Sequence, residues 1–470
     1  MLSLFESYLN GRIQRVSLNG FSSDYAKIES GVPQGSVLGP LLFLIYINDL
    51  EKNIKSNVKF FADDTMLFSV VKDPTLSAND LTHDLKVISR WAFQWKMEFN
   101  PDPSKQATEM LFSCKKSEVE HPQLSFNDIP VTRVKEHKHL GLIFEPNLTF
   151  GKHLHDKMMI AKKNIGIIKH LNKFLPLKTL TLMYKALVRS HLEYCDIIYH
   201  IPHVLNTPYV GISLHSLMEK VESIQYQSAL AVTGSWKGSS RAKLYDELGW
   251  ESLSDRRMSR RVLQIHKIVA HNTPTYLRQK LPPGRRNLIF LPYIFQNIRC
   301  RTGRYKNSFF PDSISIWNEI ICDFEHFPTF SELKNHLLSL IRPIPRPTFD
   351  VYDPTNLRYI FQLRIGLSHL RSHKFRHNFV DTQSDKCLCH QGVEDTCHFL
   401  LFCPFYETCR ATLITGVQSI LQKNDVNCDV DLKVLLYGHP SLDDKDNRNI
   451  ITLTISYIIN TKRFSPNLPG

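Results

Sequence analysis

Short apolar runs rich in β-branched and aromatic residues predict β-strands early in the chain. Two such runs, at residues 58–62 and 66–71, flank Asp63 and Asp64. They predict a hairpin with both carboxylates at its tip, because side chains of this kind pack well on a pleated surface. A second hairpin is predicted in residues 12–28 around Asn19-Gly20, after a helix at residues 2–9. Further short strands are expected in residues 107–112 and 122–150.

Apolar residues spaced three or four positions apart predict helices in the rest of the chain. In residues 79–95 the stripe consists of Leu81, Leu85, Ile88, Trp91, Ala92 and Trp95. Similar spacing covers residues 153–199 and 214–250, and the uninterrupted apolar runs at 37–47 and 450–459 predict buried elements. The predicted fold class is therefore α+β, with the strands in roughly the first 150 residues and helices beyond them.

Charge adds a candidate partner to this picture. The 470 residues carry a net charge of +13, which points to a polyanion, nucleic acid first and an anionic membrane surface second. Residues 256–306 contain thirteen Lys or Arg and no Asp or Glu, interleaved with aromatic residues. Such a stripe suits a flexible nucleic-acid strand, although a solvated basic helix is the alternative. The candidate contacts are Arg256, Arg257, Arg260, Arg261, Arg285 and Arg286.

Nothing in the sequence predicts secretion or a membrane span. No apolar run reaches the roughly 18–20 residues that cross a bilayer, and the first residues lack a basic segment and carry Glu6. We therefore expect an intracellular protein, in which the ten Cys are reduced thiols and metal ligands rather than disulfides.

A cluster of cysteines near the C-terminus predicts a zinc site. Cys387, Cys389, His398 and Cys403 offer three thiolates and an imidazole, a donor set that suits tetrahedral Zn²⁺. Cys-x-Cys is tighter than the usual spacing, and Cys397 or Cys409 could replace one of these ligands. The alternative is a set of buried reduced thiols.

The two adjacent carboxylates at the predicted hairpin tip allow two interpretations. Asp63 and Asp64 repel each other unless a cation lies between them, and Mg²⁺ prefers such oxygen ligands. A solvated turn is the alternative, because Asp favours turns in general. What favours the metal is the preceding stretch, residues 31–40, whose glycines and prolines make a loop where backbone can approach a ligand closely.

Gly-Val-Pro-Gln-Gly-Ser-Val-Leu-Gly-Pro at 31–40 and Phe-Ala-Asp-Asp at 61–64 resemble, in order and spacing, the palm of jockey-like non-LTR retrotransposon reverse transcriptases. The resemblance implies RNA-templated DNA synthesis, in which a primer 3′-hydroxyl attacks the α-phosphate of a dNTP. It makes Asp63 and Asp64 ligands of two Mg²⁺ ions. It also implies that Pro33, Gln34, Gly35 and Phe61 form the nucleotide pocket. Lys105 would lie near the triphosphate, and the alternative is that Lys105 is an ordinary surface residue.

The same resemblance extends along the chain. It implies that a turn at Leu140-Gly141 grips the primer end and that the helices of 153–199 form a thumb against the template–primer duplex. Residues 398–406 resemble the C-terminal zinc segment of the family. We predict a partial palm at 1–150, a thumb-like region at 151–250, a basic helical nucleic-acid-binding region at 251–342, and a linker with a zinc module at 343–470.

The chain departs from the family pattern in one respect. The first palm strand of the family carries a third metal-binding Asp, but Asp24, in a Ser-Ser-Asp turn, is the only Asp in residues 1–30. The resemblance therefore implies a truncated C-terminal portion, without the fingers and the first palm motif and inactive alone. The alternative is a non-catalytic RNA- or DNA-binding protein that uses the basic stripe and the zinc module.

Overall fold

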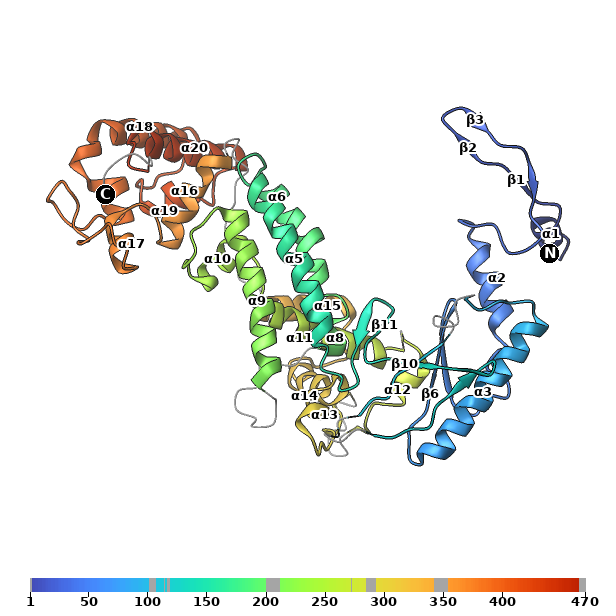
Figure 1. The fold of residues 1–470 in the computed structure, drawn as a ribbon. Helices are drawn as coiled ribbons and strands as arrows, with labels where there is room; N and C mark the ends of the chain where they lie inside the picture. The colour runs from blue at the N-terminus through green and yellow to red at the C-terminus, as the bar shows by residue number, and fades with distance from the viewer. Residues whose placement is uncertain are drawn as a thin grey trace. The chain divides into compact units, whose positions relative to one another are not determined.

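The computed structural model describes residues 2–100, 107–113, 115, 119–199, 212–271, 273–284, 293–341 and 354–464. Within it the chain forms two compact units, Met1–Leu148 and Thr149–Gly470 (Figure 1). The structure mixes helices and strands, as the predicted α+β class requires. The finer division of the second unit at residues 250 and 342 stays a prediction.

The described strands lie in the first unit and pair in twos. Five pairs are antiparallel (β1–β4, β2–β3, β5–β6, β8–β9 and β11–β12), and β7–β10 is parallel. The elements of this unit are α1 (Leu2–Leu9), β1 (Ile13–Gln14), β2 (Ser17–Leu18), β3 (Phe21–Ser22), β4 (Ala26–Lys27), α2 (Leu38–Ile47), β5 (Asn57–Phe61), β6 (Asp64–Phe68), α3 (Pro74–Gln94), β7 (Thr108–Glu109), β8 (Ser125–Phe126), β9 (Ile129–Pro130), β10 (Thr132–Arg133), β11 (His137–His139) and β12 (Leu142–Phe144).

Local sequence explains the turns and the long helix. Asn19 and Gly20 both have positive φ, as do Leu140 and Gly141, and this geometry closes the β2–β3 and β11–β12 hairpins in two residues. The helix α3 starts where Asp73 accepts hydrogen bonds from the amides of Thr75 and Leu76. The predicted hairpins and amphipathic helix are therefore present.

The prediction that residues 37–47 form a buried helix is half wrong. They do form α2, but only Gly39 and Ile47 are buried there, while Leu41, Leu44 and Ile45 are at least half exposed. A helix that is apolar all round carries no periodicity to show which side packs. Among the described residues its packing is one-sided, with Tyr46 against the rings of Trp91 and Trp95.

The described elements of the second unit are all helices, apart from two isolated β-bridges. Its elements are α5 (Gly151–Leu171), α6 (Leu177–Met183), the π-helix η1 (Tyr184–Arg189), α7 (Ser190–Leu192), α8 (Asp196–Tyr199), α9 (Ile212–Thr233), α10 (Arg241–Leu248), α11 (Leu253–Val269), α12 (Thr275–Arg278), α13 (Gly303–Lys306), α14 (Phe309–Ile321), α15 (Phe330–Ile341), α16 (Pro354–Ile365), α17 (Arg371–Arg376), the π-helix η2 (His398–Phe402), the 3₁₀-helix η3 (Pro404–Tyr406), α18 (Glu407–Lys423), α19 (Leu432–Tyr437) and α20 (Asp444–Asn460).

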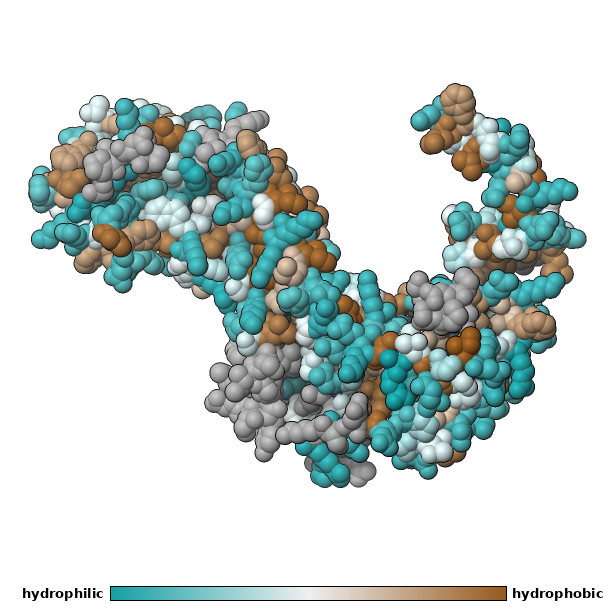
Figure 2. Space-filling model, viewed as in Figure 1, coloured by the Kyte–Doolittle hydropathy of each residue, from teal (hydrophilic) through white to brown (hydrophobic). Residues whose placement is uncertain are grey.

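Apolar side chains from α11, α14 and α15 form one core of this unit, centred on Ile265, Trp317 and Leu333. The predicted buried run at 450–459 is confirmed, because α20 buries most of its apolar side chains. Figure 2 shows that apolar residues (brown) also interrupt the polar surface of both units. No helix among the described residues is both long and apolar enough to cross a bilayer.

One buried carboxylate joins three distant helices of the second unit. Glu247 on α10 lies 3.1 Å from the guanidinium of Arg364 on α16, and both side chains are 3% exposed. The same carboxylate accepts a 3.0 Å hydrogen bond from the hydroxyl of Tyr437 on α19. Each pairing compensates the cost of burying the charge, so these contacts fix α10, α16 and α19 relative to one another.

Candidate functional site

Asp63 and Asp64 lie at the tip of the β5–β6 hairpin, where the sequence pattern places them. Phe61 pairs with Asp64, so Ala62 and Asp63 alone make the connection, and Ala62 has a φ of 51°. Both carboxylates are exposed. This geometry presents two adjacent sets of oxygen ligands to solvent, a donor set that suits a hard cation.

The start of this hairpin is held by Asp84, a residue that the sequence reasoning missed. Asp84 on α3 is fully buried and accepts hydrogen bonds from the amides of Lys55 (2.9 Å) and Ser56 (2.8 Å). Burial raises its pKa, but these amide bonds outweigh that effect, and the pKa lies below its ordinary value. The available signal was its position, since Asp84 falls on the apolar stripe between Leu81 and Ile88.

His137 on strand β11 lies close enough to the hairpin tip for the charge of Asp64 to affect the pKa of its imidazole. Burial and the neighbouring His139 lower the pKa of His137, and the carboxylate of Asp64 opposes that shift. The rings of His137 and His139 stack, with centroids 6.3 Å apart. The predicted primer-gripping hairpin is thus electrostatically coupled to the predicted metal ligands.

Three of the four residues predicted to form a nucleotide pocket lie in the loop that leads into α2. Pro33 is half-buried, whereas Gln34 and Gly35 are exposed, and Gly35 has a φ of 78°, which favours glycine. Phe61, at the end of β5, is 63% exposed. The predicted residues Lys105, Arg285 and Arg286 lie outside the described residues.

Two of the arginines predicted to bind nucleic acid are interior. Arg257 is 2% exposed and faces Asp196 at 3.7 Å. Arg261 is fully buried, with Nη1 2.6 Å from Asp312 and Nη2 donating to the carbonyl of Ile197 at 3.1 Å. The prediction that they contact a polyanion is wrong for this structure, because neither guanidinium reaches the surface.

The other two described arginines are half-buried in the same network. Arg256 lies 2.5 Å from Glu193 and 2.6 Å from Glu251. Arg260 lies 2.9 Å from Glu193 and 2.7 Å from Asp196. Burial lowers the pKa of Arg256, but the bonds to Glu193 and Glu251 more than offset it.

The charge count of residues 256–306 misled because the partners lie elsewhere in the chain. Glu193, Glu251, Asp196 and Asp312 all fall outside that window. The folded chain brings them to α11, where they form ion pairs with Arg256, Arg257, Arg260 and Arg261. For the partly exposed Arg256 and Arg260, contact with nucleic acid stays a prediction.

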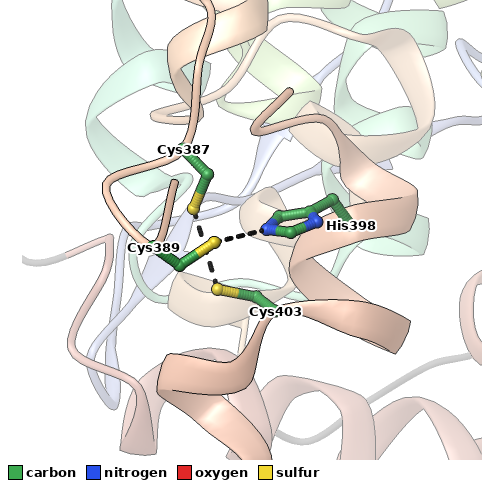
Figure 3. Close-up of side chains that lie close together, drawn as sticks. All are labelled: Cys387, Cys389, His398 and Cys403. Carbon is green, nitrogen blue, oxygen red and sulfur yellow. Dashed lines mark hydrogen bonds between the residues drawn. The ribbon is translucent and has the colours of Figure 1, made fainter. Parts of the chain in front are cut away.

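The four predicted zinc ligands converge (Figure 3). One donor atom from each of Cys387, Cys389, His398 and Cys403 can be chosen so that all four lie within 4.8 Å of one another. The Cys387 and Cys403 sulfurs are 3.7 Å apart, and Cys389 Sγ is 3.2 Å from His398 Nε2. Two sulfurs at ~2.3 Å from a tetrahedral Zn²⁺ would be ~3.8 Å apart, so the cluster has the size of a zinc site.

Local backbone geometry preorganises this cluster. His398 begins the π-helix η2, and the amide of Cys403 donates to the His398 carbonyl at 2.7 Å, which closes the turn between two of the ligands. The amide of Gln391 donates to Cys389 Sγ at 3.4 Å. Burial raises the pKa of Cys387 to about 12, so its thiolate needs a cation for stability. Neither Cys397 nor Cys409 belongs to the group.

Comparison with known proteins agrees with this geometry. Residues 2–144 match the family described as reverse transcriptase (RNA-dependent DNA polymerase). This region contains the α1–α3 helices, the loop at 31–36 and the Asp63-Asp64 hairpin.

Relatives from mobile elements extend the similarity. A probable RNA-directed DNA polymerase from transposon X-element of Drosophila melanogaster is 28% identical over 241 residues, covering 49% of this chain and 25% of the relative. The RNA-directed DNA polymerase from mobile element jockey of the same species is 25% identical over 243 residues, covering 49% and 24%. That of Drosophila funebris is 25% identical over 249 residues, covering 50% and 25%.

The chain thus spans about a quarter of the length of these curated relatives. The matched family, the order of the two motifs and the relatives all agree. Residues 2–144 of the chain thus match the reverse transcriptase family, and the chain is similar to RNA-directed DNA polymerases of jockey-like mobile elements.

Proposed function

We propose that this chain takes part in RNA-templated DNA synthesis and supplies Asp63 and Asp64 as ligands of the catalytic metal ions. The observation that carries the proposal is the hairpin tip itself. It presents two adjacent exposed carboxylates within the region that matches the reverse transcriptase family. The substrates are a dNTP, an RNA template and a DNA primer.

The residues of this unit have distinct roles in that reaction. Asp63 and Asp64 would hold Mg²⁺, which stabilises the attacking and leaving oxygens of phosphoryl transfer when it is bound. Gly35 lets the backbone of the loop approach the nucleotide, Pro33 restricts the loop, and Gln34 lies between them. Lys105 would neutralise or protonate the leaving pyrophosphate.

Metal-directed cleavage tests the proposed metal site without requiring activity. With added hydrogen peroxide and ascorbate, Fe²⁺ that replaces Mg²⁺ reduces the peroxide to hydroxide and a hydroxyl radical, and ascorbate regenerates Fe²⁺. The radical cuts the nearby backbone, so we expect cuts around residues 61–66. The double substitution Asp63→Asn and Asp64→Asn abolishes them. Asp128→Asn is the matched control, because Asp128 also occupies an exposed tip, that of the β8–β9 hairpin. Equal cleavage in all variants would refute the site.

Primer extension tests the catalytic step. Two carboxylates assemble a two-metal site poorly, so we expect the 470-residue chain alone to extend no primer on an RNA template with Mg²⁺ or Mn²⁺. Extension that Asp63→Asn abolishes would show instead that this chain completes the site. Either result is read against the same assay with a whole jockey-type polymerase.

We also propose that Cys387, Cys389, His398 and Cys403 bind a structural Zn²⁺. A closed set of four protein ligands leaves no position for substrate, so the ion would stabilise the fold and take no part in catalysis. The 3.7 Å separation of the Cys387 and Cys403 sulfurs supports this proposal.

Nucleic-acid binding without catalysis is the second candidate function, and the exposed face of α5 supports it. Lys152, Lys162, Lys163 and Lys169 are exposed there. Space is open beside Gly166 on the same helix, so a backbone could approach closely. Attraction between such lysines and phosphates is sequence-independent and falls with salt.

A double substitution on α5 tests this face, with Asp63→Asn as the control. Lys162→Gln with Lys163→Gln is expected to weaken duplex binding and to lower the salt slope by about two. Asp63→Asn should leave binding unchanged, because it lies in the other unit. An unchanged salt slope in the double lysine variant would exclude α5 as the contact.

A further inference from the structure

Arg12 ties the end of α1 to the start of the loop at residues 31–36. Its Nε donates to the carbonyl of Leu9 at 2.8 Å, the last residue of α1. Its Nη2 donates to the carbonyls of Gly31 (2.7 Å) and Ser30 (3.3 Å). A planar guanidinium can serve these separate acceptors at once, which an ammonium on a flexible stem does poorly.

The other end of the loop is held from the same helix. Ser36 Oγ donates to the carbonyl of Pro33 at 2.8 Å and accepts from the amide of Gly39 at 3.0 Å. The hydroxyl of Tyr8 is also hydrogen-bonded to Ser36 Oγ. Because the single proton of Ser36 goes to Pro33, Tyr8 is the donor.

The loop is packed tightly against the first turn of α2. A Cβ atom at Gly39 would meet Ser36 Oγ at 3.0 Å and the Pro33 carbonyl at 3.2 Å. The Pro33 carbonyl and the Ser36 hydroxyl therefore lie tightly against Gly39, so the two ends of the exposed Gln34-Gly35 segment have little room to shift.

Hydrogen bonds, not a core, hold α1 against this loop. No residue of α1 is buried, and the strands β1–β4 are exposed along their length. The backbone carbonyl of Arg12 also accepts from the amide of Ile28 at 2.9 Å, so the same residue anchors the base of the β1–β4 ribbon.

We propose that Arg12 and Tyr8 are positioning residues that clamp the loop at residues 31–36 from both ends and set the position of Gln34 and Gly35. The clamp stands on the hydrogen bonds alone. Its consequence, that the two residues fix the backbone on which a dNTP lies, rests on the proposed polymerase function. Neither side chain is expected to touch the nucleotide.

Hydrogen exchange tests the clamp without activity. In Arg12→Gln and Tyr8→Phe we expect the Gly39 amide to exchange about tenfold faster, the effect of losing one or two net hydrogen bonds. Arg12→Lys should fall between wild type and Arg12→Gln. Arg15→Gln is the matched control, because Arg15 carries the same charge three residues away and lies over the Tyr25 ring. Wild-type exchange at Gly39 in Arg12→Gln and Tyr8→Phe would overturn the clamp.

Equilibrium binding of a fluorescent dNTP with Mg²⁺ tests the consequence. Arg12→Gln should raise the dissociation constant about tenfold and Arg15→Gln should leave it unchanged. Faster exchange with unchanged affinity would overturn the role in nucleotide positioning. A wild-type chain that binds no dNTP would refute the nucleotide role together with the proposed function, while the exchange result still decides the clamp.

Discussion

Nη1 of Arg261 lies 2.6 Å from Oδ2 of Asp312, and the arginine side chain is completely buried. Burial lowers the pKa of Arg261 and raises that of Asp312, and in each case the partner's charge opposes the shift. Each charge is therefore tolerated in the interior mainly because the other is there.

Removal of one partner should be costly. Arg261→Met leaves the Asp312 carboxylate buried without its guanidinium, and we expect the free energy of unfolding to fall by about 3–5 kcal/mol. Urea denaturation measures this loss. The double substitution Arg261→Met with Asp312→Leu should recover most of it, and a double variant as unstable as Arg261→Met would contradict the ion-pair interpretation.

Asp84 should control the order of the hairpin that carries Asp63 and Asp64. Asp84→Ala removes the acceptor of two backbone amides, at an expected cost of about 1–3 kcal/mol, seen as faster hydrogen exchange in β5 and β6. Asp80→Asn is the control. Asp80 contacts the side chain of Lys55 at 3.1 Å, but both groups are partly exposed, so its loss should cost under about 1 kcal/mol. Equal destabilisation by Asp84→Ala and Asp80→Asn would contradict the role of Asp84 in ordering the hairpin.

His373 should make the second unit sensitive to acid. Burial lowers its pKa from 6.5 to about 4, helped by Arg376 and opposed by Asp395, while His377 and Lys243 add further positive charge nearby. Its Nδ1 lies 2.8 Å from the hydroxyl of Ser368, which donates to a neutral ring.

The direction in which stability changes with pH follows from proton uptake on unfolding. Between pH 6.5 and 4 the unfolded state holds the proton and the folded state does not, so stability falls as the pH falls through this window. The contribution is about 3 kcal/mol. His373→Asn should remove that part of the pH dependence in urea titrations at each pH. A variant with the wild-type slope would contradict the assignment.

The proposed zinc site predicts that only some cysteine substitutions will remove the metal. Cys387→Ser or Cys403→Ser should abolish stoichiometric zinc, measured by elemental analysis, and the absorption of a Co²⁺ substitute. Both variants, and wild type with a chelator, should melt at lower temperature. Cys397→Ser and Cys409→Ser should keep the metal, since neither residue belongs to the cluster. Zinc retained by Cys403→Ser would refute the ligand set.

Sequence reasoning worked where the information is local. The Asp63-Asp64 tip follows from two flanking strand patterns, and the proximity of Cys387, Cys389, His398 and Cys403 follows from residue type and spacing. It failed where the outcome depends on distant residues. The partners of Arg257 and Arg261 lie at Asp196 and Asp312, and no local pattern reveals them.

Two further features needed the folded backbone. An unbroken apolar run such as 37–47 does not say which side of its helix is covered. The role of Arg12 depends on carbonyl groups, which every residue has, so its side chain gave no signal in the sequence.

The carboxylate of Glu247 has a consequence for how the protein is made. The two groups that it binds on other helices follow it by 117 and 190 residues in the chain. On the ribosome, α10 is therefore synthesised long before Arg364 and Tyr437 exist. These contacts join residues that are far apart in the sequence, so they form late. The second unit therefore completes its folding only once translation has passed residue 437.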